Sequence, residues 1–225
     1  MGKKKKDKTF KKMQQQQKQS EKSKQKAKKY VFWTLSIIVV ITVIWLISQS
    51  GLTSRETPSS ENRPFVGPEN AEIVFLEFGC YTCPFTKQFN LQVMNQLIDE
   101  YSDRVKFVYR SVPITQNIGS ELAAQAGKCA FEQGDFFEYS NYVFETNTYT
   151  RDNLVGFARE MNFDIAEFEE CLDSQKYRDE VREDIRAARR AGVTITPTVF
   201  INDVRITGVH DISLYRRVLN DMLAE

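Results

Sequence analysis

The feature that most constrains the fold is a pair of cysteines placed between a predicted strand and a predicted helix. Residues 71–78 (AEIVFLEF) are apolar and rich in β-favouring residues, which is typical of a buried strand. Cys80 and Cys83 follow, and the residues after Pro84 show helical spacing of apolar side chains over residues 94–101. The start of a helix stabilises a thiolate through its free N–H groups and its dipole. The pattern therefore favours a redox-active thiol site.

A metal site is disfavoured as an explanation of this motif. A C-x-x-C zinc site requires a second pair of ligands, whereas Cys129 and Cys171 lie far apart in the sequence. The chain has a single histidine, His210, which excludes sites with several histidine ligands. We therefore expect no metal and no dissociable cofactor.

Pro84 distinguishes the two cysteines of the motif. Proline is favoured at the first helical position, where its missing N–H costs nothing, so Cys83 is predicted to be the N-cap. If Cys80 capped the helix, Pro84 would lie one turn inside it and forfeit a hydrogen bond. We therefore expect Cys83 to be the more acidic thiol and the nucleophile. The opposite assignment, with Cys80 as the nucleophile, stays open.

The rest of the C-terminal part completes an α/β order. Further elements are predicted at residues 105–112 (strand), 119–133 (alanine-rich helix), 198–201 and 204–206 (hairpin) and 212–223 (amphipathic helix). Residues between about 115 and 191 are mainly helical, and the acidic stretch 168–190 is expected to be a solvated helical face. A βαβ start, a helical middle and a ββα end predict a thioredoxin-like fold with a helical insertion.

Residues 68–225 resemble the DsbA-like thiol–disulfide oxidoreductases of the thioredoxin superfamily. In the segment IVFLEFGCYTCPFTKQF, the resemblance places Glu77 on the family's buried acid, Cys83 on its nucleophile and Thr86 on its second cysteine. Thr86 thus departs from the family pattern. Either Cys80 replaces the lost partner, or Cys83 works alone through mixed disulfides. A second alignment takes Cys80 and Cys83 as the active pair and loses the match at Glu77.

A second landmark of the resemblance is GVTITPTVFIN, at residues 192–202. It is similar to the family loop whose proline is cis and lies against the active-site cysteines. The resemblance therefore implies a cis bond before Pro197 and a backbone at Thr196 that is free to pair with an extended substrate. For Glu77 it implies a partly buried proton acceptor with a raised pKa. The alternatives are an ordinary proline at a strand start and a surface carboxylate.

Cys129 and Cys171 lie in the predicted helical insertion. If this domain is outside the cytoplasm, the two cysteines tend to pair. Such a disulfide closes a loop of about 43 residues, which stabilises the fold by about 4 kcal/mol in the chain-entropy model. The alternative is two buried thiols.

The N-terminal part predicts a membrane anchor. Residues 31–47 (VFWTLSIIVVITVIWLI) carry no charge, and as a helix they span about 26 Å, close to the thickness of a hydrocarbon core. Residues 1–29 hold 13 lysines against two acidic residues, a net charge of +11, whereas the remaining 196 residues hold 18 basic and 28 acidic side chains, a net charge of −10. We expect a disordered arm over residues 1–29, a transmembrane signal-anchor over 30–48 and a linker over 49–67.

The lysines also predict an orientation. The positive-inside rule places residues 1–29 in the cytoplasm and residues 68–225 outside, with a single pass through the cell membrane. A cleaved signal peptide is the alternative, because Ser48-Gln49-Ser50 is a small-x-small triplet. We interpret the lysine arm as a determinant of topology and not as a nucleic-acid site.

These features together predict a membrane-anchored thiol–disulfide oxidoreductase that acts on cysteines of extracytoplasmic proteins through a mixed disulfide. The expected partners are cysteine-containing secreted or membrane proteins and a membrane redox partner that resets the site. Two alternatives stay open. One is a disulfide isomerase or reductase of the same chemistry. The other is a non-catalytic thioredoxin-fold adaptor in which Cys80 and Cys83 form a structural disulfide.

Overall fold

The computed structural model describes residue 33, residues 35–43, residue 45, residues 58–113 and residues 117–224. The chain divides into two units, Met1–Ser54 and Arg55–Glu225. In the first unit the described residues, between Trp33 and Trp45, are helical. Across the described residues, no helix is both long enough and apolar enough to cross a membrane. The predicted lysine arm and much of the predicted anchor and linker lie outside the described residues.

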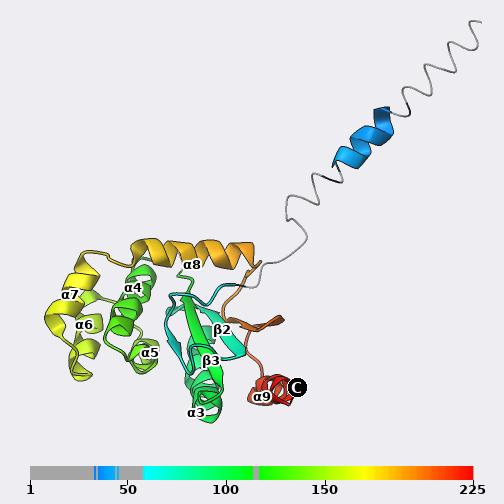
Figure 1. Ribbon diagram of the computed structural model, residues 1–225. Helices are drawn as coiled ribbons and strands as arrows, with labels where there is room; N and C mark the ends of the chain where they lie inside the picture. The colour runs from blue at the N-terminus through cyan, green and yellow to red at the C-terminus, as the bar shows by residue number, and fades with distance from the viewer. Residues whose placement is uncertain (1–32, 34, 44, 46–57, 114–116, 225) are drawn as a thin grey trace, which may run out of the picture. The chain divides into compact units, whose positions relative to one another are not determined.

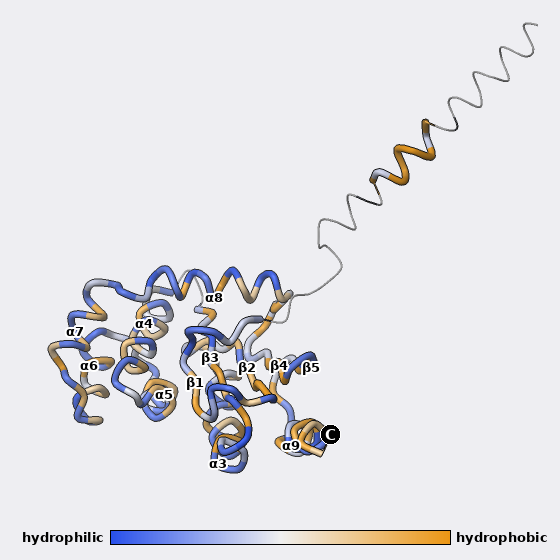
Figure 2. The backbone as a smooth tube through the Cα atoms, viewed as in Figure 1, coloured by the Kyte–Doolittle hydropathy of each residue, from blue (hydrophilic) through white to orange (hydrophobic). Residues whose placement is uncertain are grey.

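The second unit is built on a sheet whose described strands follow the order β1-β3-β2-β4-β5 (Figure 1). These strands are β1 (Phe65–Val66), β2 (Ile73–Gly79), β3 (Val105–Ser111), β4 (Thr198–Ile201) and β5 (Val204–Thr207). The central strands β2 and β3 run parallel, and the other neighbouring pairs run antiparallel. In the tube view, hydrophobic stretches follow these central strands (Figure 2). Burial of both faces explains why β2 is almost continuously apolar in sequence, whereas β3 also buries the charged residues Lys106 and Arg110.

Helices cover both faces of this sheet. One face packs against α2 (Pro84–Phe89), the π-helical turn η1 (Asn90–Met94), α3 (Asn95–Tyr101) and α9 (Ile212–Leu223). The other face packs against α8 (Arg178–Arg190). Strand alternation divides β2 accordingly, because Ile73 and Phe75 belong to the first core and Leu76 and Phe78 to the second.

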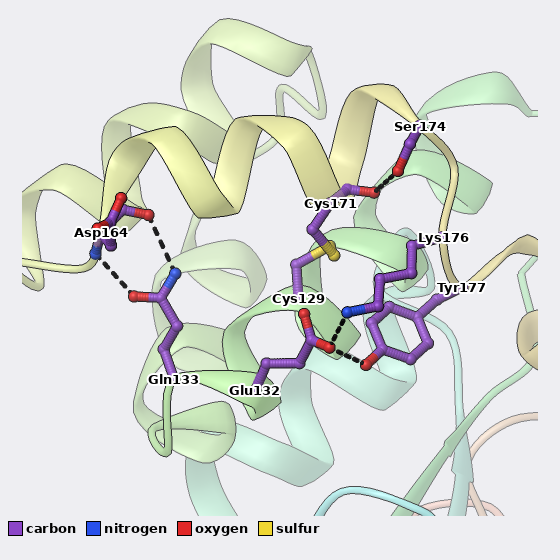
Figure 3. The surroundings of a disulfide bond; sticks show 8 residues. All are labelled: Cys129, Glu132, Gln133, Asp164, Cys171, Ser174, Lys176 and Tyr177. Atoms are coloured by element: carbon purple, nitrogen blue, oxygen red, sulfur yellow. Dashed lines mark hydrogen bonds and ion pairs between the residues drawn. A yellow bond between two sulfur atoms is a disulfide. The ribbon is translucent and has the colours of Figure 1, made fainter.

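The helical insertion comprises α4 (Ile118–Glu132), α5 (Phe136–Glu145), α6 (Arg151–Glu160), α7 (Ile165–Asp173) and α8. Helices α4 to α7 build a core of their own, which also takes in Tyr81 and Tyr109 from the sheet side. Cys129 of α4 and Cys171 of α7 form a disulfide within it, with an S–S length of 2.05 Å and Cα atoms 5.9 Å apart (Figure 3).

The predicted linker over residues 49–67 ends too late in the sequence, because its last residues already belong to the folded domain. Phe65–Val66 forms β1 and pairs with β3, and the side chain of Arg63 is buried. Arg63 Nε lies 2.6 Å from Oδ1 of Asp184, which explains why this polar segment is held against the domain. A two-residue strand has too few positions to show a periodicity, so sequence alone did not reveal it.

The acidic stretch over residues 168–190 is solvated over much of its length, as its composition predicts, but one charged residue of it is buried. It contains the end of α7 and all of α8, which is mostly hydrophilic along its length (Figure 2) but has a buried face. Asp184 on that face is fully buried and lies 2.9 Å from Arg110 Nε and 3.2 Å from Lys128 Nζ, as well as contacting Arg63. A buried carboxylate needs such partners, because an unpaired ion in the interior is strongly destabilising.

Candidate active site

The turn between β2 and α2 holds the two cysteines of the motif. Cys83 is the N-cap of α2 and Pro84 occupies the first turn, as the sequence predicts. The N–H of Lys87 donates to the carbonyl oxygen of Cys83 at 3.0 Å, which is the first helical hydrogen bond. The N–H of Cys83 donates to the carbonyl oxygen of Cys80 at 3.0 Å and closes the loop between them. The two thiols, both free, are thus held on one tight turn.

The two sulfurs lie in different surroundings. Cys80 is only 1% exposed, whereas Cys83 is partly open to solvent. Cys80 Sγ lies 3.2 Å from Oγ1 of Thr82 and 3.6 Å from Oγ of Ser120, which comes from the start of α4. Buried Thr86, which one alignment of the family resemblance places on the second cysteine, accepts a hydrogen bond from the N–H of Cys80 at 3.4 Å.

These contacts shift the pKa values of the two thiols in opposite directions. A hydrogen bond from Cys83, together with those from Thr82 and Ser120, lowers the pKa of Cys80 to about 5 in spite of its burial. Donation to Cys80 and burial raise the pKa of Cys83, against a smaller lowering by the hydroxyl of Thr196. The hydroxyl donors thus favour a thiolate at Cys80, whereas the helix start favours one at Cys83. Sequence correctly placed Cys83 at the helix start but did not show which hydroxyls gather around Cys80.

The loop before β4 lies against Cys83. The peptide bond between Thr196 and Pro197 is cis, and the side chain of Thr196 lowers the pKa of the Cys83 thiol beside it. Pairing of β4 with β2 begins at Thr198, so Thr196 precedes the ladder. Two large apolar side chains beside these residues in sequence are exposed, Phe85 at 63% and Ile195 at 53%. The surroundings of Cys83 thus combine a backbone segment outside the sheet with accessible apolar surface.

Glu77 lies within β2, next to the site in sequence and fully buried. Alternation along the strand puts it on the face of Ile73 and Phe75, under η1, and Asn90 Nδ2 donates to its Oε1 at 2.9 Å. Its Oε2 has no hydrogen-bond partner among the described residues. Burial raises the pKa of Glu77 to about 8, against a lowering by Asn90. The carboxyl group is therefore mostly neutral at pH 7, and it can donate or take up a proton.

Tyr81, between the two cysteines, was not identified from sequence as part of the site. It is fully buried in the core of the helical insertion, with its ring centre 4.8 Å from that of Phe144 and its hydroxyl 2.8 Å from Oγ of Ser140. The hydroxyl of Tyr149 donates to its carbonyl oxygen at 2.9 Å. At Gly127 an added Cβ would lie 2.5 Å from the Tyr81 hydroxyl, so a side chain there would displace the ring. The insertion thereby fixes the loop between the cysteines.

Comparison with known proteins agrees with this geometry. A sequence model described as thioredoxin matches residues 59–221. Disulfide bond formation protein D of Bacillus subtilis is 27% identical over 165 residues, which cover 68% of this chain and 74% of that protein. The Na(+)/H(+) antiporter NhaA 3 of Salinispora tropica is 29% identical over 168 residues, which cover 73% of this chain and 26% of the antiporter. The chain thus spans about a quarter of the length of such antiporters.

Solved structures share the fold. Oxidised BdbD from Bacillus subtilis superposes with a TM-score of 0.66 at 24% identity and covers 75% of this chain and 96% of its own. The α-DsbA1 of Wolbachia pipientis gives a TM-score of 0.64 at 23% identity, with 75% and 95% covered. The strand–cysteine–helix turn, the cis-proline loop and the family match over residues 59–221 agree with one another. The chain belongs to the thioredoxin family, and its fold is shared with the solved DsbA-like structures.

Proposed function

We propose that this DsbA-like thiol–disulfide oxidoreductase is an oxidant that donates a Cys80–Cys83 disulfide to pairs of cysteines in proteins outside the cytoplasm. The proposal rests on a difference in solvent exposure and in hydrogen-bonding surroundings between the two sulfurs. Cys83 is accessible at the helix start, whereas Cys80 is buried among groups that stabilise its thiolate. An incoming sulfur therefore reaches Cys83, and Cys80 is the better leaving group.

The exchange then runs in two steps. A substrate thiolate attacks Cys83 Sγ and forms a mixed disulfide, while the bond between Cys83 and Cys80 breaks and its electron pair passes to Cys80. A second substrate thiolate attacks the substrate sulfur of the mixed disulfide and releases Cys83 as a thiolate. Lower pKa makes a thiol leave faster, so the donors around Cys80 favour the first step. The substrate dithiol is oxidised to a disulfide and the enzyme disulfide is reduced to two thiols.

The neighbouring groups support this direction of exchange. An extended substrate segment can pair with the backbone at Thr196 and rest on the exposed side chains of Phe85 and Ile195. Glu77, with its pKa raised to about 8, supplies a proton to a leaving thiolate or removes one from a thiol. Regeneration requires an oxidant at the membrane, either a disulfide of higher potential or a quinone-linked protein.

The proposed location is the outer side of the cell membrane, with residues 1–29 in the cytoplasm and residues 30–48 as the anchor. The charge of +11 on residues 1–29 and the uncharged stretch over residues 31–47 support it. The Cys129–Cys171 disulfide supports an oxidising compartment. Protease added to intact spheroplasts should digest residues 68–225, and protection of that domain would contradict the orientation.

The function is tested by mixing the oxidised protein with a reduced, unfolded ribonuclease and following the recovery of ribonuclease activity. We expect stoichiometric oxidation by the native protein and none by Cys83→Ser. Equilibration with glutathione gives the reduction potential, and we expect it close to about −120 mV, the range of strong oxidants. A value near about −270 mV would instead mark a reductant. Slow, equal alkylation of both cysteines with no ribonuclease oxidation would mark a non-catalytic adaptor.

A further inference from the structure

Three polar side chains, those of Cys80, Thr82 and Ser120, gather on the buried side of the cysteine loop. Cys80 Sγ lies 3.2 Å from Thr82 Oγ1 and 3.6 Å from Ser120 Oγ, and the two hydroxyl oxygens are 3.1 Å apart. Ser120 is 1% exposed, so bulk water does not replace its contacts. Thr82 belongs to the loop itself, whereas Ser120 is supplied by α4 of the helical insertion.

The hydrogen bonds in this cluster have a direction. The hydroxyl of Thr82 donates to the oxygen of Ser120. A thiolate at Cys80 can only accept, so it requires a hydrogen from a neighbour. The Ser120 hydroxyl, which accepts from Thr82, is thus a donor to the sulfur alongside Cys83 and Thr82, and the hydrogen bond from Thr82 strengthens its donation.

The backbone holds Ser120 in place without using its side chain. Asn117 is the N-cap of α4, and its side chain accepts a hydrogen bond from the N–H of Ser120 at 3.2 Å. Replacing the Ser120 hydroxyl by hydrogen therefore leaves the cap intact. A Ser120→Ala substitution therefore tests the hydrogen bond from this hydroxyl to the sulfur without removing the cap of the helix.

We infer that Ser120 is a further catalytic residue, whose hydroxyl receives the negative charge that develops on Cys80 when a thiolate attacks Cys83 and the disulfide breaks. The inference rests on the proposed function, because it takes Cys83 as the attacked sulfur. Donation to the thiolate stabilises the reduced protein, and the disulfide becomes more oxidising as a result. Ser120, which lies in the helical insertion and outside the cysteine motif, thus raises the reduction potential of the Cys80–Cys83 pair.

The test is the reduction potential of Ser120→Ala, measured by equilibration with glutathione, together with the pH titration of thiolate absorbance in the reduced protein. We expect the equilibrium constant to shift about tenfold toward the oxidised protein, which is about 30 mV. The thiolate should form at higher pH than in the native protein. Thr82→Val, which removes the hydroxyl that donates to Ser120, should shift both quantities in the same direction.

Asn117→Ala is the matched control, because it removes the cap of α4 and keeps the Ser120 hydroxyl. It should lower the stability and leave the potential nearly unchanged. An equal shift in Asn117→Ala would assign the effect to helix placement and overturn the inference. An unchanged potential and titration in Ser120→Ala would also overturn it.

Trapping of substrate separates this inference from the proposed function. Cys80→Ser, with Cys83 first converted to its mixed disulfide with glutathione, should trap a reduced substrate on Cys83 with release of glutathione, both with and without Ser120→Ala. If trapping succeeds in both and the potential of Ser120→Ala is unchanged, only the role of Ser120 is wrong. If no substrate is trapped on Cys83 in either protein, the proposed function fails and the inference fails with it.

Discussion

The chain contains two pairs of cysteines, and helix α4 is tied to both. Cys129 of α4 is joined to Cys171 within the apolar core of the helical insertion. At the start of the same helix, Ser120 reaches the sulfur of Cys80. The sulfurs of the first pair are cross-linked in that core, whereas those of the second lie beside hydroxyl groups and a helix start. The difference teaches that the surroundings of a sulfur, rather than its spacing in sequence, decide whether it is structural or reactive.

The largest expected effect comes from Cys83→Ser. It should lower the rate of substrate oxidation on the order of 10³-fold or more, the scale on which removal of a nucleophile acts. Ribonuclease reoxidation measures this rate. The control is Cys171→Ala assayed at a temperature at which it is folded, and it should keep the native rate per folded molecule. Comparable losses of oxidation rate in both variants would mean that the two cysteine pairs do not differ in their role in catalysis.

Removing the other pair should act on stability instead. In the double variant Cys129→Ala with Cys171→Ala, we expect the free energy of unfolding to fall by about 4 kcal/mol, because the two cysteines are 42 residues apart and their link restricts the unfolded chain. Urea denaturation measures this loss. The reduction potential of the Cys80–Cys83 pair should stay at its native value, and a large change in that potential would show that the two pairs are coupled.

The pH dependence of the free energy of unfolding should show the titration of the buried Glu77 carboxyl group. Its pKa is raised from 4.5 to about 8, so the contribution of its neutral form is fully present below pH 4.5 and is lost as pH rises through 8. Between pH 4 and pH 9 the native protein should lose on the order of 4 kcal/mol through this group. Glu77→Gln should lack that loss. Urea denaturation of both proteins in the oxidised form, where the cysteines do not titrate, isolates the difference.

If Glu77→Gln shows the same dependence on pH as the native protein, Glu77 is not the titrating group. Asn90→Ala offers a second check, since it removes the hydrogen bond that lowers the pKa of Glu77. The loss of stability should then be centred at higher pH than in the native protein.

The smallest expected effect concerns the contact between the insertion and the cysteine loop. Tyr149→Phe removes the hydroxyl that donates to the carbonyl oxygen of Tyr81, and it should lower the free energy of unfolding by about 1 kcal/mol. Tyr142→Phe is the control, because Tyr142 stacks on Phe157 within the insertion. Thermal unfolding compares the two variants. A loss in Tyr149→Phe no greater than in Tyr142→Phe would mean that this hydrogen bond does not hold the loop.

Sequence patterns within a few residues correctly predicted several elements of the fold. Pro84 placed the helix start and Cys83 at its cap, and apolar spacing gave the last helix, Ile212–Leu223, with its observed bounds. Both follow from preferences of the backbone within a few residues. The burial of Glu77 was implied by the family resemblance and not by the strand pattern.

The parts that sequence missed depend on contacts between distant segments. Asp184 is neutralised by Arg63 and Arg110, which are 121 and 74 residues away, so no local pattern marks it as buried. Ser120 reaches Cys80 across 40 residues. Its position in an alanine-rich helix gives no sign of a role at the sulfur. Sequence therefore did not show that Cys80 has hydroxyl donors of its own.

The central claim is that Cys83 receives the attack and Cys80 leaves. The most direct test loads the remaining cysteine of each variant with glutathione as a mixed disulfide, adds a reduced substrate protein that displaces the glutathione, and maps the resulting adducts by mass spectrometry of peptides. The account predicts that Cys80→Ser accumulates the adduct, that every adduct maps to the peptide containing Cys83, and that Cys83→Ser accumulates none. Adducts that form only in Cys83→Ser, through Cys80, would contradict it.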